Sequence, residues 1–286
     1  MAAPADAPVL VGLGSDLDLP VVAQAAQEAA GHGRPLHLLH TFDWQAAFAA
    51  DTVAAPRDRA EQLITQAAQL AHQTEPGLTV GAEIVESALL PTLIRRSETA
   101  FLLAVGDSGM AGSGQCIPAE TSAVQLAARA GCPLMVVRRE PPPQGPVLVG
   151  VDGSPSSHLA LRWAVECATR RDARLLALRV VEYDEDTDAV AEQLSEALAR
   201  HTDLHGGVPT ECRVVRGDPA EVLIDMSRSA QVALVAARGD EPGRAMLGAV
   251  AQSLLYHSPA PVVVVRGLAE MPLAERAARP GRDQRP

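Results

Sequence analysis

The chain has 286 residues, enough for about two domains of ordinary size. It carries 24 basic and 35 acidic side chains, and the formal net charge of −11 argues against a nucleic-acid partner, which would require neutralisation of a phosphate backbone. Every basic residue is arginine, so a lysine Schiff base and the lysine-bearing phosphate loop are excluded, and aromatic residues at 2% make ring-stacking ligand sites improbable.

No apolar run reaches the roughly 20 residues that a membrane span needs, so we expect no membrane association. Residues 1–8 lack the positive region and apolar stretch of a signal peptide. The spacing of the cysteines is not that of a metal site, at positions Cys116, Cys132, Cys167 and Cys212. We therefore expect reduced thiols in a cytoplasmic protein.

Internal repeats show that the chain is a tandem duplication. Val9–Gly12 recurs as Val147–Gly150, an offset of 138, and later motifs recur at offsets near 130. The repeats predict one domain over residues 8–139 and a second over residues 146–266. Between them, residues 140–145 read Glu-Pro-Pro-Pro-Gln-Gly, the composition of a short stiff linker.

Within the second copy, apolar runs of strand length alternate with longer helical stretches. The predicted strands are 147–151, 174–181, 210–215, 231–236 and 261–265, and the predicted helices are 159–168, 184–200, one beginning at Pro219, and 249–257. This alternation predicts an α/β fold with a parallel, doubly wound sheet in each copy. The tail, residues 268–286, has little apolar periodicity, and we expect it to be disordered.

The fifth strand of each copy would be an exposed apolar sheet edge if each copy stood alone. These strands are Leu134–Val137 and Val262–Val265. An edge of this kind invites aggregation, so we expect the two strands to pair antiparallel within one chain, which gives an intramolecular pseudo-dimer.

In open α/β sheets, ligands bind beyond the carboxyl ends of the strands, so the residues after strand one are candidates. The second copy reads Val151-Asp152-Gly153-Ser154 there. The carboxylate of Asp152 can accept hydrogen bonds from ribose hydroxyls or help to hold Mg²⁺, and a turn or helix-cap role is the alternative. The first copy lacks this aspartate, and Asp16 further along is expected to be a cap.

The residues after strand four form glycine-containing loops that lead into a helix. Their free amides could cradle phosphates at the start of that helix. The candidates in the second copy are Arg238, Gly239, Gly248 and Ala249, and those in the first copy are Gly106, Gly109 and Thr121.

Both copies resemble universal stress protein domains. The resemblance rests on Val147–Ser157, Leu161–Ala164, Gly217–Val222 and Pro261–Arg266. It implies, for each copy, a Rossmann-like (HUP-type) open sheet of five parallel strands in order 3-2-1-4-5, flanked by helices. It also implies dimerisation through strand five and, in one subgroup, ATP binding through Gly-x₂-Gly-x₉-Gly-Ser/Thr together with the aspartate after strand one.

Neither copy matches that ATP-binding pattern completely. In the first copy Glu120 stands where the third glycine belongs, before Thr121, and a carboxylate there would repel phosphates. The second copy has Ala236 for the first glycine and Ala249 in place of the hydroxyl residue. We therefore expect any nucleotide to bind weakly and only in the second copy.

Three further patterns are set aside. Residues Gly106–Gly109 match the nucleophile motif of trypsin-like proteases. Those proteases are β-barrels with disulfides, whereas this motif follows a strand of a predicted parallel sheet. His201 and His205 have a zinc-compatible spacing without a third ligand, and the acidic run 182–188 lacks the spacing of a calcium loop. We expect no catalytic residue and no resident metal.

The composition, the repeats and the resemblance predict a cytoplasmic stress-associated regulatory protein that is not an enzyme. Its expected activity is weak adenine-nucleotide binding, with ATP and Mg²⁺ as the ligands. The alternative is a nucleotide-independent interaction module whose phosphate loops have degenerated. An ATP-using enzyme has no supporting motif, and the association of two chains into a further homodimer stays open.

Overall fold

The computed structural model describes residues 4, 6–15, 18–41, 54–107, 122–182, 185–202, 207–238 and 247–266. The first half contains β1 (Val9–Leu13), α1 (Leu19–Gly31), β2 (Leu36–Thr41), α3 (Ala54–Thr74), β3 (Val80–Val85), α4 (Leu89–Ser97), β4 (Leu102–Gly106), α5 (Ser122–Arg129) and β5 (Leu134–Val137). The second half contains β6 (Val147–Gly150), α6 (Pro155–Arg170), β7 (Leu175–Val181), α7 (Thr187–Thr202), β8 (Thr210–Arg216), α8 (Pro219–Ser227), β9 (Val232–Ala236), α9 (Ala249–His257) and β10 (Val262–Val265).

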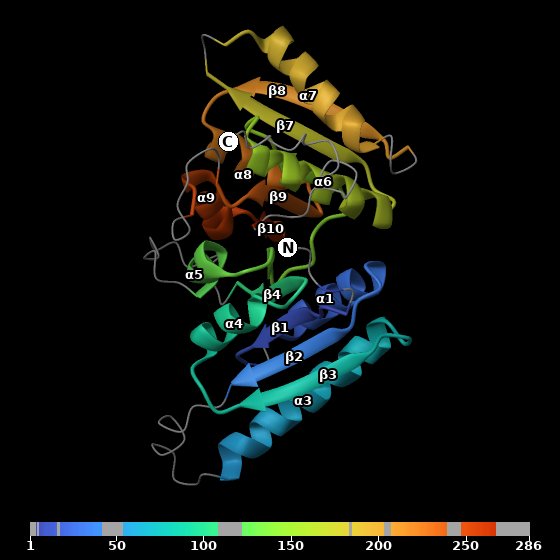
Figure 1. The fold of residues 1–286 in the computed structure, drawn as a ribbon, viewed down its shortest axis with the longest axis vertical. Helices are drawn as coiled ribbons and strands as arrows, with labels where there is room; N and C mark the ends of the chain where they lie inside the picture. Colours follow the sequence, from blue (N-terminus) through green and yellow to red (C-terminus); the bar gives the residue numbers. More distant parts are fainter. Residues whose placement is uncertain are drawn as a thin grey trace, which may run out of the picture.

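All ten strands join into one sheet in the order β3-β2-β1-β4-β5-β10-β9-β6-β7-β8 (Figure 1). Within each half the strands are parallel and follow the order 3-2-1-4-5 that the resemblance implies. The two fifth strands, β5 and β10, pair antiparallel, with Met135 opposite Val263. The edges that would have been exposed in separate halves are therefore covered.

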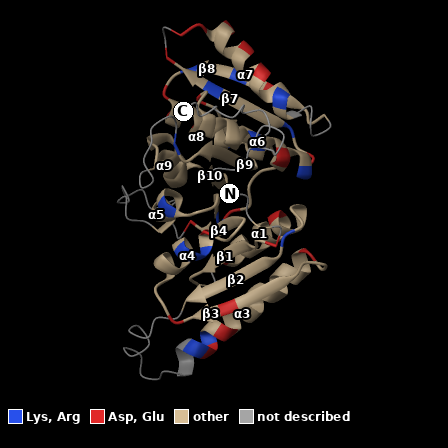
Figure 2. Ribbon diagram, in the orientation of Figure 1, with Lys and Arg blue, Asp and Glu red and all other residues tan. Residues whose placement is uncertain are grey.

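The centre of the sheet is buried on both faces. Strands β1, β4, β5, β10, β9 and β6 contain no charged residue and are drawn in tan (Figure 2). Their alternate side chains enter two apolar layers, one covered by α1, α3, α6 and α7 and the other by α4, α5, α8 and α9. Continuous Val and Leu runs suit such doubly covered strands. In the described part of the chain, no helix has the length and apolar character to cross a bilayer.

Helix α6 begins four residues earlier than the apolar spacing predicts. Ser154 is the N-cap, and its hydroxyl accepts a hydrogen bond of 3.1 Å from the backbone N–H of Ser157. Pro155 follows in the first helical turn, where its missing N–H costs nothing. Helix α7 begins at Thr187, three residues later than predicted, whereas α9 has the predicted bounds.

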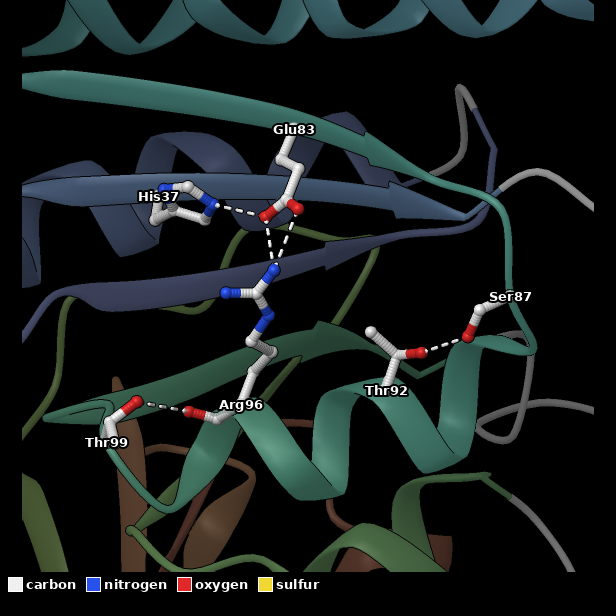
Figure 3. Close-up of polar contacts among 6 residues, drawn as sticks. All are labelled: His37, Glu83, Ser87, Thr92, Arg96 and Thr99. Carbon is white, nitrogen blue, oxygen red and sulfur yellow. Dashed lines mark hydrogen bonds and ion pairs between the residues drawn. The ribbon is translucent and has the colours of Figure 1, made fainter.

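Polar contacts on the outer part of the first half hold α4 against β3 and β2 (Figure 3). Nη2 of Arg96 lies 2.8 and 2.7 Å from the two carboxylate oxygens of Glu83, and Nε2 of His37 lies 3.5 Å from the same group. The second half has a different contact at the equivalent place, because Arg213 occupies the position that corresponds to Glu83. Its Nη1 lies 3.7 Å from the sulfur of Met226. The cluster therefore orients a helix and is not repeated as a site.

Candidate functional site

The candidate residues of the second half lie at one edge of the sheet, after the ends of β6 and β9. These two strands are parallel neighbours, with Val147 opposite Val232, so the loops that follow them lie at the same edge of the sheet. Asp152 and Gly153 follow β6, and Arg238 follows β9. Gly109, Thr121 and Gly239, together with the tail 268–286, lie outside the described residues.

The Asp152 carboxylate is exposed but held in place by its own loop. Oδ1 accepts a hydrogen bond of 2.9 Å from the backbone N–H of Ser154. Partial burial alone would raise the pKa of Asp152. Hydrogen bonds from Ser154 and Ser157 and the positive charge of Arg179 outweigh that effect, so the net result is a lowered pKa. Asp152 is therefore an ionised acceptor at neutral pH.

Arg179, near the end of β7, reaches back over the Asp152 loop. Gly153 has a φ of +82°, and a Cβ at that position would lie 2.9 Å from Nη1 of Arg179. The guanidinium also lies 3.9 Å from the carboxylate of Glu185. Arg179 was not among the predicted site residues, although an arginine near the end of an apolar strand run was a visible signal.

The loop after β9 closes on itself at its base. The backbone N–H of Gly248 donates to the carbonyl of Ala237 at 2.9 Å, which brings the start of α9 next to Arg238. Gly248 is the N-cap of α9 and contributes no side-chain cap, and Ala249 is the first residue of the helix. The N-terminus of α9, which is the positive end of its helix dipole, thus lies at this edge of the sheet.

In the equivalent loop of the first half, the side chain of Asp18 binds the backbone amides of the loop. Oδ2 of Asp18 accepts hydrogen bonds from the backbone N–H groups of Gly14 and Ser15, at 2.8 and 3.0 Å. The same carboxylate lies in the space that a side chain at Gly106 would need. Asp18 was not among the predicted site residues, because the folding back of its side chain onto the loop becomes visible only in three dimensions.

A cavity of about 280 Å³ adjoins this loop of the first half. Asp18 and Asp107 line it together with Arg138. Asp107 is 4% exposed, and its Oδ2 lies 3.9 Å from Nη1 of the buried Arg138. Burial lowers the pKa of Arg138 to about 10, although Asp107 opposes the shift, so Arg138 stays charged at neutral pH. Two carboxylates and two arginines, Arg138 and Arg139, thus line this cavity.

Other reactive groups do not assemble into a second centre in the part of the chain that is described. There, no three His, Cys, Asp or Glu side chains are close enough to hold a metal ion. Of the two spaced histidines, His205 falls outside the described ranges, as do the serine of the protease-like motif and Cys116. Burial raises the pKa of the Cys132 thiol to about 12 and that of Cys167 to about 11, so neither is a ready nucleophile.

Known proteins resemble this chain in both sequence and fold. The model of the universal stress protein family matches residues 7–138 and again residues 145–266. Universal stress protein Rv2005c of Mycobacterium tuberculosis is 32% identical over 292 residues, covering 90% of this chain and 96% of its own length. Universal stress protein Rv2623 of the same organism is 33% identical over 272 residues, covering 86% and 91%. The crystal structure of a universal stress protein from Archaeoglobus fulgidus has a TM-score of 0.68 at 18% identity, covering 91% and 97%, a likeness of fold.

Proposed function

Because the chain belongs to the universal stress protein family, we propose that it is a stress-associated regulatory protein that binds an adenine nucleotide through its second half alone. One observation supports the proposal above others: the loop after β6 presents an exposed carboxylate, whereas the loop after β1 has its amides bound by its own aspartate. After β6, the Asp152 carboxylate is exposed and ionised beside Arg179. After β1, the loop amides of Gly14 and Ser15 are already occupied by Asp18.

The sugar end of the nucleotide would contact Asp152. Its carboxylate accepts hydrogen bonds from Ser154 and Ser157 and is exposed to solvent. An ionised carboxylate accepts strong hydrogen bonds from hydroxyl groups, and it can also serve as an oxygen ligand for Mg²⁺. Gly153 adopts a φ of +82°, which residues with side chains rarely adopt, so this loop conformation favours glycine.

The phosphate end would lie at the start of α9. The helix begins behind Gly248 without a side-chain cap, and Arg238 adds positive charge at the end of the neighbouring strand. A helix N-terminus with a nearby arginine suits an anionic group. Ala249 offers no hydroxyl, so one hydrogen bond is lacking, and we expect a dissociation constant no tighter than about micromolar.

In the first half, the loop carboxylates oppose an anion, and Arg138 and Arg139 line the same cavity. A phosphate would compete with the Asp18 carboxylate for the amides of Gly14 and Ser15 and would lie near Asp107. Each such carboxylate–phosphate approach costs on the order of 1 kcal/mol in partly solvated surroundings. We therefore propose one nucleotide site per chain.

Titration calorimetry of the full chain with MgATP tests this proposal. We expect one site per chain, and we expect Asp152→Ala to weaken binding about tenfold or more. Asp18→Ala is the control, because it removes a loop carboxylate from the other half, and it should leave the affinity of that one site unchanged. Two sites in the wild-type chain, or an affinity that ignores Asp152, would refute the assignment.

The rival function is a nucleotide-independent interaction module. The alanines at 236 and 249, where the ATP-binding pattern has a glycine and a hydroxyl residue, favour it. Mass spectrometry of the freshly purified chain separates the two, since co-purifying nucleotide supports binding, and its absence together with no heat of binding supports the rival. We also propose that the bound nucleotide is not converted, which a turnover assay with MgATP checks.

A further inference from the structure

A buried carboxylate and two arginines meet where the two halves contact one another, at the ends of α1 and α6. Glu28, on α1, is 8% exposed. Its Oε2 lies 2.9 Å from Nη2 of Arg170, and its Oε1 lies 2.7 Å from Nη2 of Arg171. Nη1 of Arg171 also donates to Oε1 of Gln231 at 3.1 Å. The first half thus supplies the anion of this contact and the second half supplies the cations.

The ends of α1 and α6 have the same backbone geometry, so their residues can be matched one to one. Gly33 and Asp172 both adopt a positive φ, of 61° and 47°. The next residues, Arg34 and Ala173, both donate their N–H to the carbonyl five positions earlier. The offset is 139 throughout, which makes Cys167 the counterpart of Glu28, Arg170 that of Gly31 and Arg171 that of His32.

The contact between α1 and α6 is therefore asymmetric, because the two halves contribute different shapes as well as different charges to it. A Cβ on Gly31 would lie 2.9 Å from Cδ of Arg170. The side chain of Arg170 therefore occupies space that is open because Gly31, its counterpart in the first half, has no side chain. The aromatic contact beside it is also unlike. Phe101 of the first half stacks on Trp163 of the second at 5.3 Å between ring centroids. Their counterparts are two glutamines, Gln231 and Gln24.

We infer that this patch specifies which half pairs with which: Glu28, Gly31 and His32 form one surface, Cys167, Arg170 and Arg171 form the other, and each accepts only its unlike partner. If two first halves paired, two Glu28 carboxylates would be buried facing each other with no arginine between them. If two second halves paired, Arg170 would meet Arg170 in the space that Gly31 leaves open, and four arginines would converge. A buried charge without its partner is strongly destabilising.

The consequence concerns partners of the chain. The strand pairing β5–β10 alone does not discriminate, because both strands are short apolar runs of four residues. The patch adds the discrimination, so the partner that fits either half is the unlike half and not a copy of itself. This inference does not rest on nucleotide binding.

Exchanging the patches within the full chain tests the inference. One triple variant, Cys167→Glu/Arg170→Gly/Arg171→His, gives both halves the Glu28 patch. The other, Glu28→Cys/Gly31→Arg/His32→Arg, gives both halves the arginine patch. We expect each triple variant to lower the folding equilibrium constant by roughly 100-fold or more, measured by urea unfolding.

The sixfold variant combines both triples and so exchanges the two patches. Because unlike surfaces face each other again, we expect it to recover most of the lost stability and to remain monomeric in light scattering. If the losses of the two triples simply add in the sixfold variant, each patch fits only its own half, and the inference is wrong.

A milder double-mutant cycle covers the case in which a triple variant fails to fold. Glu28→Gln, Arg171→Gln and their combination should be non-additive, with the double variant much less affected than the sum of the singles. The exposed pair Arg57 and Glu61 on α3, mutated in the same way, is the control and should be additive to within about twofold. Additive losses at Glu28 and Arg171 would overturn the inference as well.

Discussion

Arg138 and Arg266 lie at equivalent positions, directly after the last strand of each half, and each donates a hydrogen bond to the equivalent carbonyl in the other half. Nη2 of Arg138 lies 2.9 Å from the carbonyl of Leu255, and Nη1 of Arg266 lies 2.7 Å from that of Ala127. Both carbonyls belong to the last turn of α9 or α5, where a cation is favourable. The last helix of each half is thus held by an arginine from the other half.

Replacing Arg138 should destabilise the protein strongly. Its guanidinium is buried and also donates to the carbonyls of Leu254 and Ala260. Arg138→Met keeps much of the volume but takes one donor away from each of these carbonyls and removes the cation beside Asp107. We expect a loss of about 2–4 kcal/mol in the free energy of unfolding, measured with urea. The neighbouring Arg139 is exposed, so Arg139→Met should change stability by less than about 0.5 kcal/mol. Equal losses in the two variants would contradict this role.

Acid should destabilise the protein partly through His32. Burial first, and then the charge of Arg170, lower the pKa of His32 to about 4 despite the nearby Glu28. The folded state therefore disfavours protonation, and stability present above pH 6.5 is lost as the pH falls toward 4. Between pH 7.5 and 4.5 this loss is about 2 kcal/mol. His32→Gln should lose correspondingly less over that interval in urea unfolding, and an unchanged pH dependence would refute the expectation.

Restoring a hydroxyl at the start of α9 should strengthen nucleotide binding. Ala249 is the first helical residue after Gly248 and is exposed. Ala249→Ser adds one hydrogen-bond donor for a phosphate, and we expect about tenfold tighter MgATP binding by calorimetry. Ala249→Val, which adds bulk but no hydroxyl, is the control and should not bind more tightly. The expectation fails if serine and valine have the same effect.

A side chain at position 153 should be costly. Gly153 combines a φ of +82° with the guanidinium of Arg179 in the space that a Cβ would enter. Gly153→Ala should therefore lower the free energy of unfolding by about 1–3 kcal/mol and should also weaken MgATP binding. At Gly77 no atom lies within 4 Å of the place that a Cβ would occupy, so Gly77→Ala should be neutral or slightly stabilising. Thermal unfolding of the two variants decides between these outcomes.

Most of the fold could be predicted from the sequence because its signals are local and repeated. The Val and Leu runs of the two copies give the strands, and the matching motifs give the duplication. The early start of α6 was also predictable, since Ser154 followed by Pro155 is a strong helix-start pattern. The order of the strands required the resemblance, because apolar runs alone do not say which neighbours pair.

The candidate site was only partly predictable, for a different physical reason. Asp152 and Gly153 were found because strand ends position ligands in this fold. Arg179 and Asp18 were not, since one reaches the loop from a neighbouring strand and the other folds back onto its own loop. Side-chain paths of this kind depend on packing between elements. The same limit hid Glu28, whose arginine partners are more than 140 positions away.

The linker of residues 140–145 has a consequence for how the protein behaves at low abundance. It leads from β5 to β6 over a few residues, and the carbonyl of Gly145 accepts a hydrogen bond of 2.7 Å from Nε2 of Gln231. A short tether keeps two binding surfaces at an effective concentration of about millimolar, whatever the number of molecules in the cell. Two separate chains joined by the same strands would dissociate on dilution. The tethered halves stay assembled even when only a few copies have been made.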